Sequence, residues 1–397
     1  MNENSGMNRI NIENLECEMR VPCLAEYEQT LFLDIDSKKC TGCGACSEIC
    51  PTGAINGEAG FTHDIPFAEA CIHCGQCLLA CPHRAVYERR SWLPEVEKML
   101  ADPSVTCIAM PAPSVRHTLG EAFGLPSWSR IHEKLNTALR NLGFRHCWEV
   151  DFAADVTIWE EGAEILRRLN NGGLFPLFSS FCASLQNYIE IFQPELIPHL
   201  STCKSPAAIN GRLAKSWGAD RYRLDPASIY TVAIMPCPAK KHEALRPDLG
   251  FRNQRDIDAV LTVRELAWLL RKNLIDMAPL PPASPDPVMG AGTSLFGISG
   301  GVLDSLARFL GQKITGKKLD LCALSQHVNN DGILEYEFSI ASSKFSFAHV
   351  QGVEQLQIVC EQVLRGQSPY HYVEIMACEG GCINGAGQPL LPSMHKN

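Results

Sequence analysis

Residues 374–389 read Glu-Ile-Met-Ala-Cys-Glu-Gly-Gly-Cys-Ile-Asn-Gly-Ala-Gly-Gln-Pro, and the rest of the 397-residue chain is organised around them. The apolar run from Tyr372 to Met376 predicts a strand that leads into this stretch. Cys378 and Cys382 follow the strand, with glycines between and after them. Two thiolates wrapped in glycine at a strand end let the backbone approach a bulky inorganic group closely. A glycine-rich turn with two buried thiols would have the same sequence, so this stretch alone leaves both interpretations open.

The composition is that of an ordinary globular protein with an unusual number of cysteines. Apolar residues make up 46% and charged residues 20%, and the length allows two or three domains. The 35 basic and 44 acidic residues give a net charge of −9, which argues against nucleic-acid binding because that function needs a basic face. No apolar run reaches the ~18 residues of a membrane helix. Eight of the 19 cysteines lie in two tandem arrays, a pattern typical of metal binding.

Both arrays have the spacing C-x₂-C-x₂-C-x₃-C-P. Bacterial two-cluster ferredoxins have this spacing, and in them the fourth cysteine of one array ligates the cluster of the other. The proline after the fourth cysteine ends the loop and fixes its direction. Zinc knuckles are the competing interpretation, but zinc sites use pairs of ligands rather than this fourfold spacing. The predicted ligands are Cys40, Cys43, Cys46 and Cys81 for one [4Fe–4S] cluster, and Cys71, Cys74, Cys77 and Cys50 for the other.

The chain divides into four predicted parts. Residues 1–30 form an N-terminal arm, residues 31–90 an α+β ferredoxin-like domain with both arrays, and residues 91–104 a charged helical linker. From residue 105 to 397 strands alternate with helices, which predicts an α/β domain of mostly parallel sheets with its sites at the C-terminal ends of strands. Its predicted strands are Thr106–Met110, His146–Val150, Leu174–Ser179, Tyr230–Met235, Asp256–Thr262 and three short strands within 320–350, and its predicted helices include Asp155–Asn171, Val263–Arg271 and Val353–Arg365.

Two earlier stretches resemble known motifs together with the C-terminal one. Ile234-Met-Pro-Cys-Pro-Ala-Lys-Lys-His-Glu243 and Ser179-Ser-Phe-Cys-Ala183 each follow a predicted strand. With residues 374–389 they resemble the three active-site motifs of the [FeFe] hydrogenases. The resemblance runs from about Cys40 to Pro389 and is strongest to the large subunit of the two-subunit periplasmic enzymes. It implies that the α/β domain is a hydrogenase catalytic domain in two lobes.

The resemblance also implies a third cluster and a diiron group. In the family four cysteines hold a [4Fe–4S] cluster, and the one that matches Cys382 bridges to a diiron unit with CO, cyanide and dithiolate ligands, which maturases build. Carried to this sequence, the four ligands are Cys182, Cys237, Cys378 and Cys382. Four thiolates from three separate loops suit a buried cubane. The remaining cysteines are most simply free thiols or small buried hydrophobes: Cys17, Cys23, Cys107, Cys147, Cys203, Cys322 and Cys360.

Further residues are expected, from the same resemblance, to surround the diiron group. Lys240 would donate a charge-assisted hydrogen bond to a cyanide, and methionines would line the pocket with soft apolar contacts. Their ordinary interpretations are a serine at a helix start, core methionines, and a phosphate-binding glycine loop within 290–301, the last being weak because the spacing is not G-x-G-x-x-G. The predicted cofactor-binding residues are Pro113, Ser114, Ser205, Met235, Phe296, Gly297 and Met376.

One predicted helix carries Glu161, Glu164 and Arg168 on one face. From the spacing alone this is a solvated face with salt bridges, but the positions match the family's proton channel, together with Ser201. The channel is interrupted at Phe181, where the family has a cysteine as the last proton carrier. Phenylalanine has no exchangeable proton, so we predict slow, proton-limited turnover.

We expect an oxidoreductase: a hydrogenase large subunit that oxidises H₂ or reduces protons and relays electrons through the two ferredoxin-type clusters. Expected partners are a hydrogenase small subunit, a ferredoxin or c-type cytochrome, and the maturases. The N-terminus lacks the apolar core of a signal peptide, so we expect the cytoplasm, or the periplasm through co-export with the small subunit. The alternative is a non-catalytic relative, which would be an H₂ or redox sensor or an iron–sulfur carrier or assembly factor. Phe181 favours this alternative, whereas the two arrays and Lys240 favour the enzyme.

Overall fold

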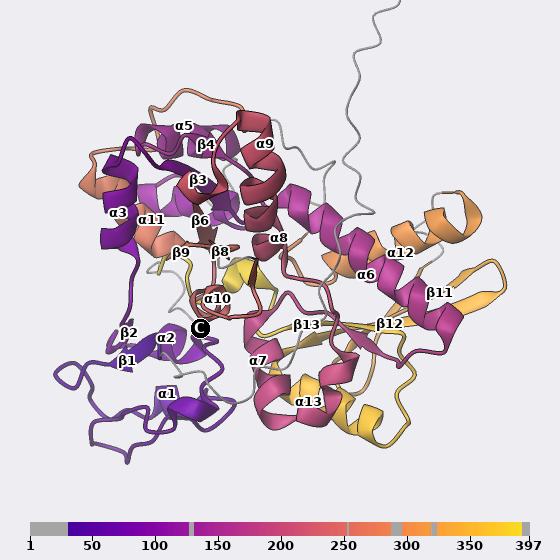
Figure 1. The fold of residues 1–397 in the computed structure, drawn as a ribbon. Coiled ribbons are helices and arrows are strands. Elements are labelled where there is room, and N and C mark those ends of the chain that lie inside the picture. Colours follow the sequence, from indigo (N-terminus) through magenta and orange to yellow (C-terminus); the bar gives the residue numbers. More distant parts are fainter. Residues whose placement is uncertain are drawn as a thin grey trace, which may run out of the picture.

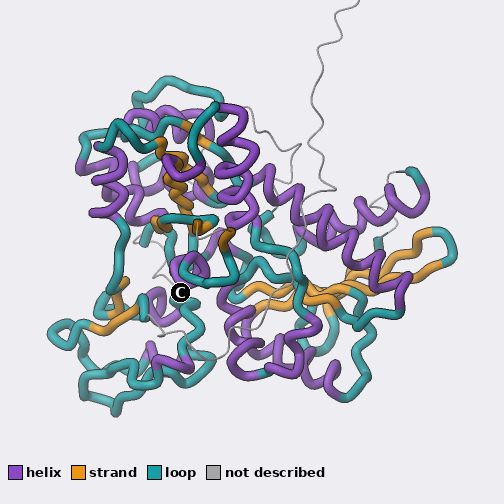
Figure 2. Tube along the Cα trace, in the orientation of Figure 1, coloured by secondary structure: helices purple, strands orange, loops and turns teal. Residues whose placement is uncertain are grey.

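The computed structural model describes residues 31–126, 131–251, 254–286, 296–317, 319 and 324–390. The described chain forms a small cysteine-rich domain and two lobes, each built on one sheet (Figure 1). The two sheets stand apart in the tube view, with helices on both faces of each (Figure 2). Three predicted features lie outside the described residues: the N-terminal arm, residues 290–295 of the glycine loop, and Cys322. No described helix is both long enough and apolar enough to cross a membrane.

The cysteine-rich domain is a small α+β unit. Two short strands pair antiparallel, and a short helix follows each cysteine loop. Each helix begins after a glycine in the left-handed conformation, Gly44 with φ 83° and Gly75 with φ 74°, where a side chain would be strained. The elements are β1 (Leu33–Ile35), α1 (Ala45–Glu48), the 3₁₀ turn η2 (Ala68–Ala70), α2 (Gln76–Ala80) and β2 (Val86–Glu88), followed by α3 (Leu93–Ala101).

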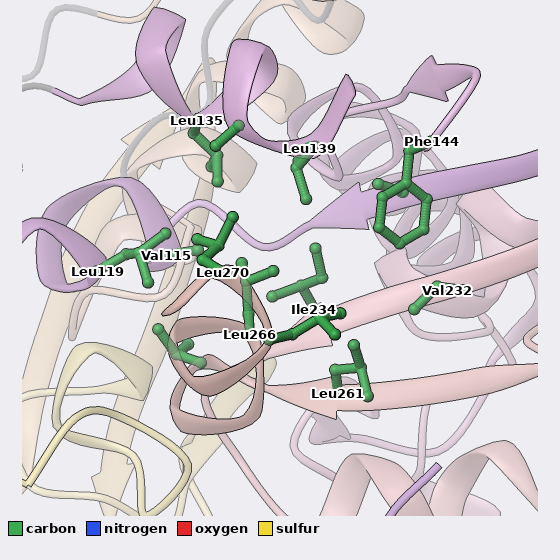
Figure 3. Close-up of a cluster of buried hydrophobic side chains, with 14 of the residues drawn as sticks. Val115, Leu119, Leu135, Leu139, Phe144, Val232, Ile234, Leu261, Leu266 and Leu270 are labelled. Atoms are coloured by element: carbon green, nitrogen blue, oxygen red, sulfur yellow. The ribbon is translucent and has the colours of Figure 1, made fainter. Parts of the chain in front are cut away.

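The first lobe is built on a parallel four-stranded sheet in the order β4-β3-β6-β9. Strand β3 alternates between two cores: Cys107 and Ala109 enter one, and Ile108 and Met110 enter the other. Leucine and valine side chains of α4, α5 and α11 pack over the first face (Figure 3), and α8 and α9 cover the other. The bounds are β3 (Thr106–Pro111), α4 (Val115–Thr118), η3 (Leu119–Phe123), α5 (His132–Asn141), β4 (His146–Cys147), α8 (Pro206–Leu213), the π-helical turn η5 (Ala214–Gly218), α9 (Ala219–Tyr222), η6 (Pro226–Ser228), β6 (Ile229–Met235), α10 (Ala239–Ala244), β7 (Gly250–Phe251), β8 (Gln254–Arg255), β9 (Ala259–Thr262) and α11 (Val263–Lys272).

The second lobe is built on a five-stranded sheet in the order β10-β11-β12-β13-β5. Its first three strands are antiparallel, and β12, β13 and β5 are parallel. On β13, Tyr372 and Met376 face the core beneath α12 and α6 (Asp151–Asn171), whereas Val373 and Ile375 face the core beneath α7 and α13. The bounds are β5 (Leu177–Phe178), α7 (Ala183–Phe192), η4 (Pro194–His199), α12 (Gly301–Thr315), β10 (Ser325–Val328), β11 (Leu334–Ile340), β12 (Ser343–Gln351), α13 (Gly352–Leu364), β13 (Tyr372–Met376) and η8 (Cys382–Asn384).

Helix α6 (Asp151–Asn171) connects the two lobes. Its first turn packs with the core on the α8 face of the first sheet, and Ile158 and Ile165 pack in the second lobe. Gly162 lies against α12 so closely that a Cβ there would be 2.3 Å from the Phe309 ring. At a rise of about 1.5 Å per residue the helix is about 30 Å long, so one rigid element spans both lobes.

The predicted fold class is confirmed, with shifted element boundaries. In the sheets of the two lobes parallel pairs outnumber antiparallel ones, and β13 has its predicted bounds. Strand β4 ends at Cys147 instead of Val150 because the chain there turns into α6, which begins at Asp151 rather than Asp155. Strand β5 has two residues rather than six.

Candidate metal centre

The ferredoxin-like domain contains two small pockets lined by cysteine. Each takes three cysteines from one array and the fourth from the other, because the two loops pack around a shared apolar core. The empty space in and around them, which includes space open to solvent, is about 340 Å³ for one and about 280 Å³ for the other. The quartets are those grouped from the spacing: Cys50, Cys71, Cys74 and Cys77 line the larger pocket, and Cys40, Cys43, Cys46 and Cys81 line the smaller.

Burial disfavours the anionic form of four thiols of these pockets, those of Cys46, Cys71, Cys74 and Cys77. Burial raises the pKa of Cys77 well above its usual value, and the neighbouring Cys74 and Cys71 raise it further. Bound iron would compensate the charge of the thiolates. Among the described residues no three His, Cys, Asp or Glu side chains converge as ligands of a single metal ion. The quartets surround cavities instead, and this arrangement fits iron–sulfur clusters.

A third cysteine quartet gathers between the lobes, where strands from both sheets end. Burial raises the pKa of Cys237 and Cys382 to about 12, and the other cysteines of the quartet add to the shift. Burial and the same neighbours raise the pKa of Cys378 well above its usual value. Lys240 acts in the opposite direction on Cys182, Cys237 and Cys382. Cys182 follows β5 and opens α7, Cys237 follows β6, and Cys378 and Cys382 follow β13.

The glycines of the C-terminal motif are needed for close packing around this quartet. A Cβ at Gly385 would lie 2.4 Å from the carbonyl oxygen of Pro236, the residue before Cys237. A Cβ at Gly381, whose φ is 94°, would lie 2.6 Å from the carbonyl oxygen of Gly297. The loops that carry Cys237 and Cys382 therefore touch through backbone, with no room for side chains between them.

The larger ferredoxin pocket lies directly beside the central quartet. Gln76, the residue after Gly75 in the second array, donates from Nε2 to Cys378 Sγ at 3.4 Å. A Cβ at Gly75 would lie 2.4 Å from Cβ of Ala386. Cys74 raises the pKa of Cys237 and Cys378. The second array and the C-terminal motif are thus in contact.

Two consecutive lysines of α10 have different surroundings. Lys240 Nζ donates to the Phe181 carbonyl at 2.9 Å and to Glu243 Oε2 at 2.6 Å, so its ammonium lies beside the residue before Cys182. Lys241 is fully buried and donates to Glu88 of β2 at 2.6 Å and to Glu265 of α11 at 2.8 Å. Lys241 therefore ties the ferredoxin-like domain to the first lobe.

Several predicted cofactor-binding residues lie around the quartet. Ser114 is 5% exposed, and its Oγ has no hydrogen-bond partner among the described residues. The helix that it opens is tied to the Cys382 loop, because Thr118 donates to Gln388 at 2.6 Å and Gln388 donates to the Cys382 carbonyl at 3.4 Å. An orphaned hydroxyl at this place fits a polar ligand on a bound metal group.

The other predicted lining residues are mainly apolar contacts. Met235 ends β6 before Pro236, and Met376 ends β13 and packs in the same cluster as Phe296. Gly297, with φ 100°, lies beside Cys382, and Pro113 is buried next to Ser114. The Ser205 hydroxyl accepts from the Ala208 amide as the cap of α8, so its part in cofactor binding stays a prediction.

Three of the predicted proton-channel residues lie on α6 and, with their partners, make up two hydrogen-bonded sets, one around Glu164 and one around Glu161, called together the α6 hydrogen-bonded group. Arg168 donates to Glu164 Oε1 at 2.6 Å, and Thr202 donates to Glu164 Oε2 from its hydroxyl at 2.9 Å. Glu161 is fully buried and accepts from the Tyr372 hydroxyl at 2.6 Å. Burial raises the pKa of Glu161 to about 7, against the opposing effect of Tyr372 and Ser201. A carboxyl group that titrates near neutral pH can both accept and release a proton.

Phe181 precedes Cys182 of the central quartet and packs in one apolar cluster with residues of α6. It is 5% exposed, and its ring packs edge-to-face against Phe296 with 4.9 Å between centroids. Both rings belong to the apolar cluster that contains Met376. The side chain of Phe181 has no polar atom, so it cannot extend the hydrogen bonds of the α6 residues toward Cys182.

Sequence reasoning missed several contacts of the site. Tyr372 donates a hydrogen bond to Glu161, and Thr202 donates one to Glu164. Gln76 donates one to Cys378. Tyr372 and Glu374 alternate with apolar residues on β13, and polar groups on a buried strand are a signal that could have identified Tyr372. Thr202 and Gln76 gave no signal of their own.

Family models match most of the chain. Residues 105–386 match the iron only hydrogenase large subunit, C-terminal domain, and residues 33–56 and 65–87 match the 4Fe-4S binding domain. The periplasmic [Fe] hydrogenase large subunit of Nitratidesulfovibrio vulgaris is 49% identical over 98% of this chain and 94% of its own length. The cytosolic iron-sulfur assembly component 3 of Bos taurus is 30% identical over 71% of this chain and 62% of its own.

Comparison with solved structures also points to [FeFe] hydrogenases. A variant of the [FeFe]-hydrogenase HydA1 from Chlamydomonas reinhardtii aligns with a TM-score of 0.69 at 29% identity, over 76% of this chain and 86% of that one. With the ferredoxin-type quartets beside a third quartet between two α/β lobes, these matches lead to one conclusion. The chain belongs to the iron-only, or [FeFe], hydrogenase large-subunit family and carries iron–sulfur cofactors.

Proposed function

We propose that this chain is the catalytic large subunit of a two-subunit [FeFe] hydrogenase that interconverts H₂ with protons and electrons. The observation that carries the proposal is the convergence of Cys182, Cys237, Cys378 and Cys382 beside the larger ferredoxin pocket. Four thiols from three separate strand ends have no structural need to meet, whereas a cubane requires them to.

The cofactors that follow are three [4Fe–4S] clusters and a diiron group. The two ferredoxin quartets would hold one cluster each, the central quartet would hold the third, and Cys382 would also bridge to the diiron group. When bound, the diiron group supplies the metal centre at which H₂ is cleaved or formed. The 49% identity to a periplasmic hydrogenase large subunit supports this assignment.

The protein's own contribution is to bind and orient the group. Lys240 would place its ammonium, and Ser114 its free hydroxyl, as donors to cyanide ligands. Met235 and Met376 would close the pocket against water with apolar, polarisable side chains. Phe296 and Gly297 would complete the wall next to Cys382. Ser205 is proposed at the edge of this pocket.

Electrons would pass through the clusters in the order of their contacts. The smaller pocket lies at the far end of the ferredoxin-like domain and shares a core with the larger pocket. The larger pocket meets the central quartet through Gln76 and Cys378. The external electron partner would be a ferredoxin or a c-type cytochrome that docks near the smaller pocket.

Protons would enter through Arg168 and Glu164 and reach Glu161 with the help of Ser201. Glu161 suits the task because the pKa of its carboxyl lies at about 7. The last step differs from the family's pattern, because the side chain of Phe181 offers no donor or acceptor. We therefore expect turnover limited by protons rather than by electrons.

The relative's description as a periplasmic large subunit leads us to propose a small-subunit partner and a periplasmic location through co-export. The competing proposal is a non-catalytic sensor or an iron–sulfur assembly role. It is favoured by Phe181 and by the 30% identity to a cytosolic iron–sulfur assembly component. Lys240 beside the central quartet favours the enzyme.

Infrared spectroscopy and iron analysis of the protein matured under anaerobic conditions test these proposals. An enzyme should show CO and cyanide bands, about fourteen iron atoms per chain, and H₂ uptake with a dye acceptor. Three clusters without a diiron group would give about twelve iron atoms and no such bands, which would favour the assembly or sensor role. Saturation at about four to eight iron atoms would contradict the central quartet itself.

A further inference from the structure

A buried acid and a buried histidine lie behind Met376 on the sheet of the second lobe. Glu374 of β13 and His349 of β12 are register partners across two parallel strands, and they are 0% and 1% exposed. His349 Nδ1 lies 3.3 Å from Glu374 Oε2, which is close enough for an ion pair. The contact lacks the alignment of a hydrogen bond, because both side chains have orphaned polar atoms.

The pair is unusual because its polar groups are not satisfied by the described protein. Neither nitrogen of His349 and neither carboxyl oxygen of Glu374 has a hydrogen-bond partner among the described residues. Burying such groups without partners is strongly unfavourable. Buried polar groups in native proteins are satisfied by protein or by ordered water. Four unsatisfied atoms together therefore indicate a hydrated internal site.

The pair is also connected to the proton-channel residues. Because side chains alternate along a strand, Tyr372, Glu374 and Met376 share one face of β13. The Tyr372 hydroxyl donates to Glu161 at 2.6 Å. The charges of Glu161 and Glu374 both act on Tyr372, and that of Glu374 also acts on Cys382. A polar line thus runs from Glu161 along the sheet to Glu374, and Met376 follows Glu374 on the same face before the cysteines of the central quartet.

We propose that Glu374 and His349, connected to Glu161 through the Tyr372 hydroxyl, form a hydrated proton relay that passes around Phe181 on the sheet side. The inference rests on the proposed hydrogenase function. Glu374 and His349 each accept and release a proton, water spans the gap of two residues along β13, and Tyr372 passes protons by accepting one and donating another. The route is longer than a direct thiol contact, so it gives slow turnover rather than none.

The first test needs no activity. A crystal structure of the protein with iron–sulfur clusters but no diiron group should show ordered waters bonded to Glu374 and His349, one of them within hydrogen-bond distance of Tyr372. A dry pair, with its polar atoms paired to protein alone, would overturn the relay. This test gives the same answer whether or not the protein is a hydrogenase.

The second test uses H₂ uptake by the matured protein with a dye acceptor. Glu374→Gln should lower the rate about tenfold or more in the wild-type background and less than about twofold in the Phe181→Cys background, because the cysteine restores the direct route. Glu379→Gln is the matched control: it changes an exposed acid of the same motif and should leave both rates unchanged. CO and cyanide bands and iron content must be equal in all variants.

Equal losses from Glu374→Gln in both backgrounds would overturn the relay while leaving the hydrogenase function intact. If Glu374→Gln fails to retain iron, Tyr372→Phe decides, because it removes one hydroxyl at nearly constant volume. An unchanged rate in Tyr372→Phe would then contradict the connection. The absence of CO and cyanide bands would overturn the proposed function. The crystallographic test alone would then decide whether the site at Glu374 and His349 is hydrated.

Discussion

The ferredoxin-type pockets and the central quartet place four thiols around a cavity in different ways. Each ferredoxin pocket takes three cysteines from one short loop, Cys40–Cys50 or Cys71–Cys81, and one from the other loop. The central quartet takes its cysteines from the ends of three strands in two sheets, spread from Cys182 to Cys382. The first kind of site depends on local spacing, and the second depends on the packing of both lobes. Damage far from the cysteines should therefore affect the central site first.

The largest expected effect is the loss of the central cluster in Cys237→Ala. The variant should lose about four of the iron atoms of a three-cluster protein, all H₂ uptake, and part of its stability, because cluster binding is coupled to folding. Anaerobic iron and sulfide analysis measures the loss. The ferredoxin signals in electron paramagnetic resonance should remain, since those pockets are formed locally.

Cys203→Ala is the matched control, because Cys203 is 2% exposed but is not a proposed ligand. It should retain all its iron. Equal iron loss in both variants would show that Cys237 is not specifically a ligand of the central cluster. The central quartet would then not differ from the ferredoxin pockets in the way described above.

The second largest expected effect is a gain in the rate of H₂ uptake. Phe181→Cys places a thiol directly before Cys182 of the central quartet, and H₂ uptake should rise about tenfold or more, because proton carriers typically contribute on the order of 10²–10⁴-fold. The double variant Phe181→Cys/Glu161→Gln should lose this gain. No gain in fully matured protein, or a gain that Glu161→Gln leaves untouched, would mean that protons reach the site without the α6 group.

Lys241→Met tests the connection between the two kinds of site. The change leaves Glu265 without a cationic partner among the described residues and Glu88 with Arg264 alone, which should cost about 3 kcal/mol of stability. Denaturation followed by the visible absorption of the clusters measures it, at one protein concentration and one scan rate. The central cluster should bleach before the ferredoxin clusters.

Lys272→Met is the control, because its pair with Glu97 is half exposed and should contribute only about 0–1 kcal/mol. If both variants unfold alike, or if all clusters bleach together, the ferredoxin-like domain does not depend on Lys241 for its attachment.

The smallest expected effect is a pH-dependent difference in stability for Glu161→Gln. The pKa of Glu161 is raised to about 7 in the folded protein, so the unfolded chain releases this proton at lower pH than the folded one does. The wild type therefore loses stability as pH rises from about 4.5 to about 7, and glutamine does not. The thermal midpoint of the variant should rise relative to that of the wild type as the pH increases from about 5.5 to about 8. A constant difference across that range would contradict the raised pKa.

The sequence identified the parts of the site that depend on local spacing or on motif resemblance. The ferredoxin quartets follow from the C-x₂-C-x₂-C-x₃-C-P arrays, and β13 follows from its apolar run. Contacts between distant residues were not predictable in this way. Lys241 and Lys240 look alike in the sequence, and only the packing of β2 against α10 and α11 shows that one of them is a fully buried connection.

The proton contacts show the same limit. The spacing of Glu161, Glu164 and Arg168 indicated one helix face, but it could not show that Glu161 is fully buried or that Tyr372 bonds to it. The Glu374–His349 pair depends on the register of β12 with β13, which no local pattern determines. The end of β4 was placed too late because the turn into α6 has the same apolar character as the strand.

The contact of Gly75 with Ala386 has a consequence for engineering. Because a Cβ at Gly75 would lie 2.4 Å from the Ala386 side chain and 2.9 Å from Pro238, the ferredoxin-like domain cannot be exchanged freely for another two-cluster module. A transplanted module would need glycine at this position and an amide donor directly after it, as Gln76 is here. Modules with a larger residue there would be held away from the catalytic lobes, and a chimaera would carry its clusters without a close path for electrons between them.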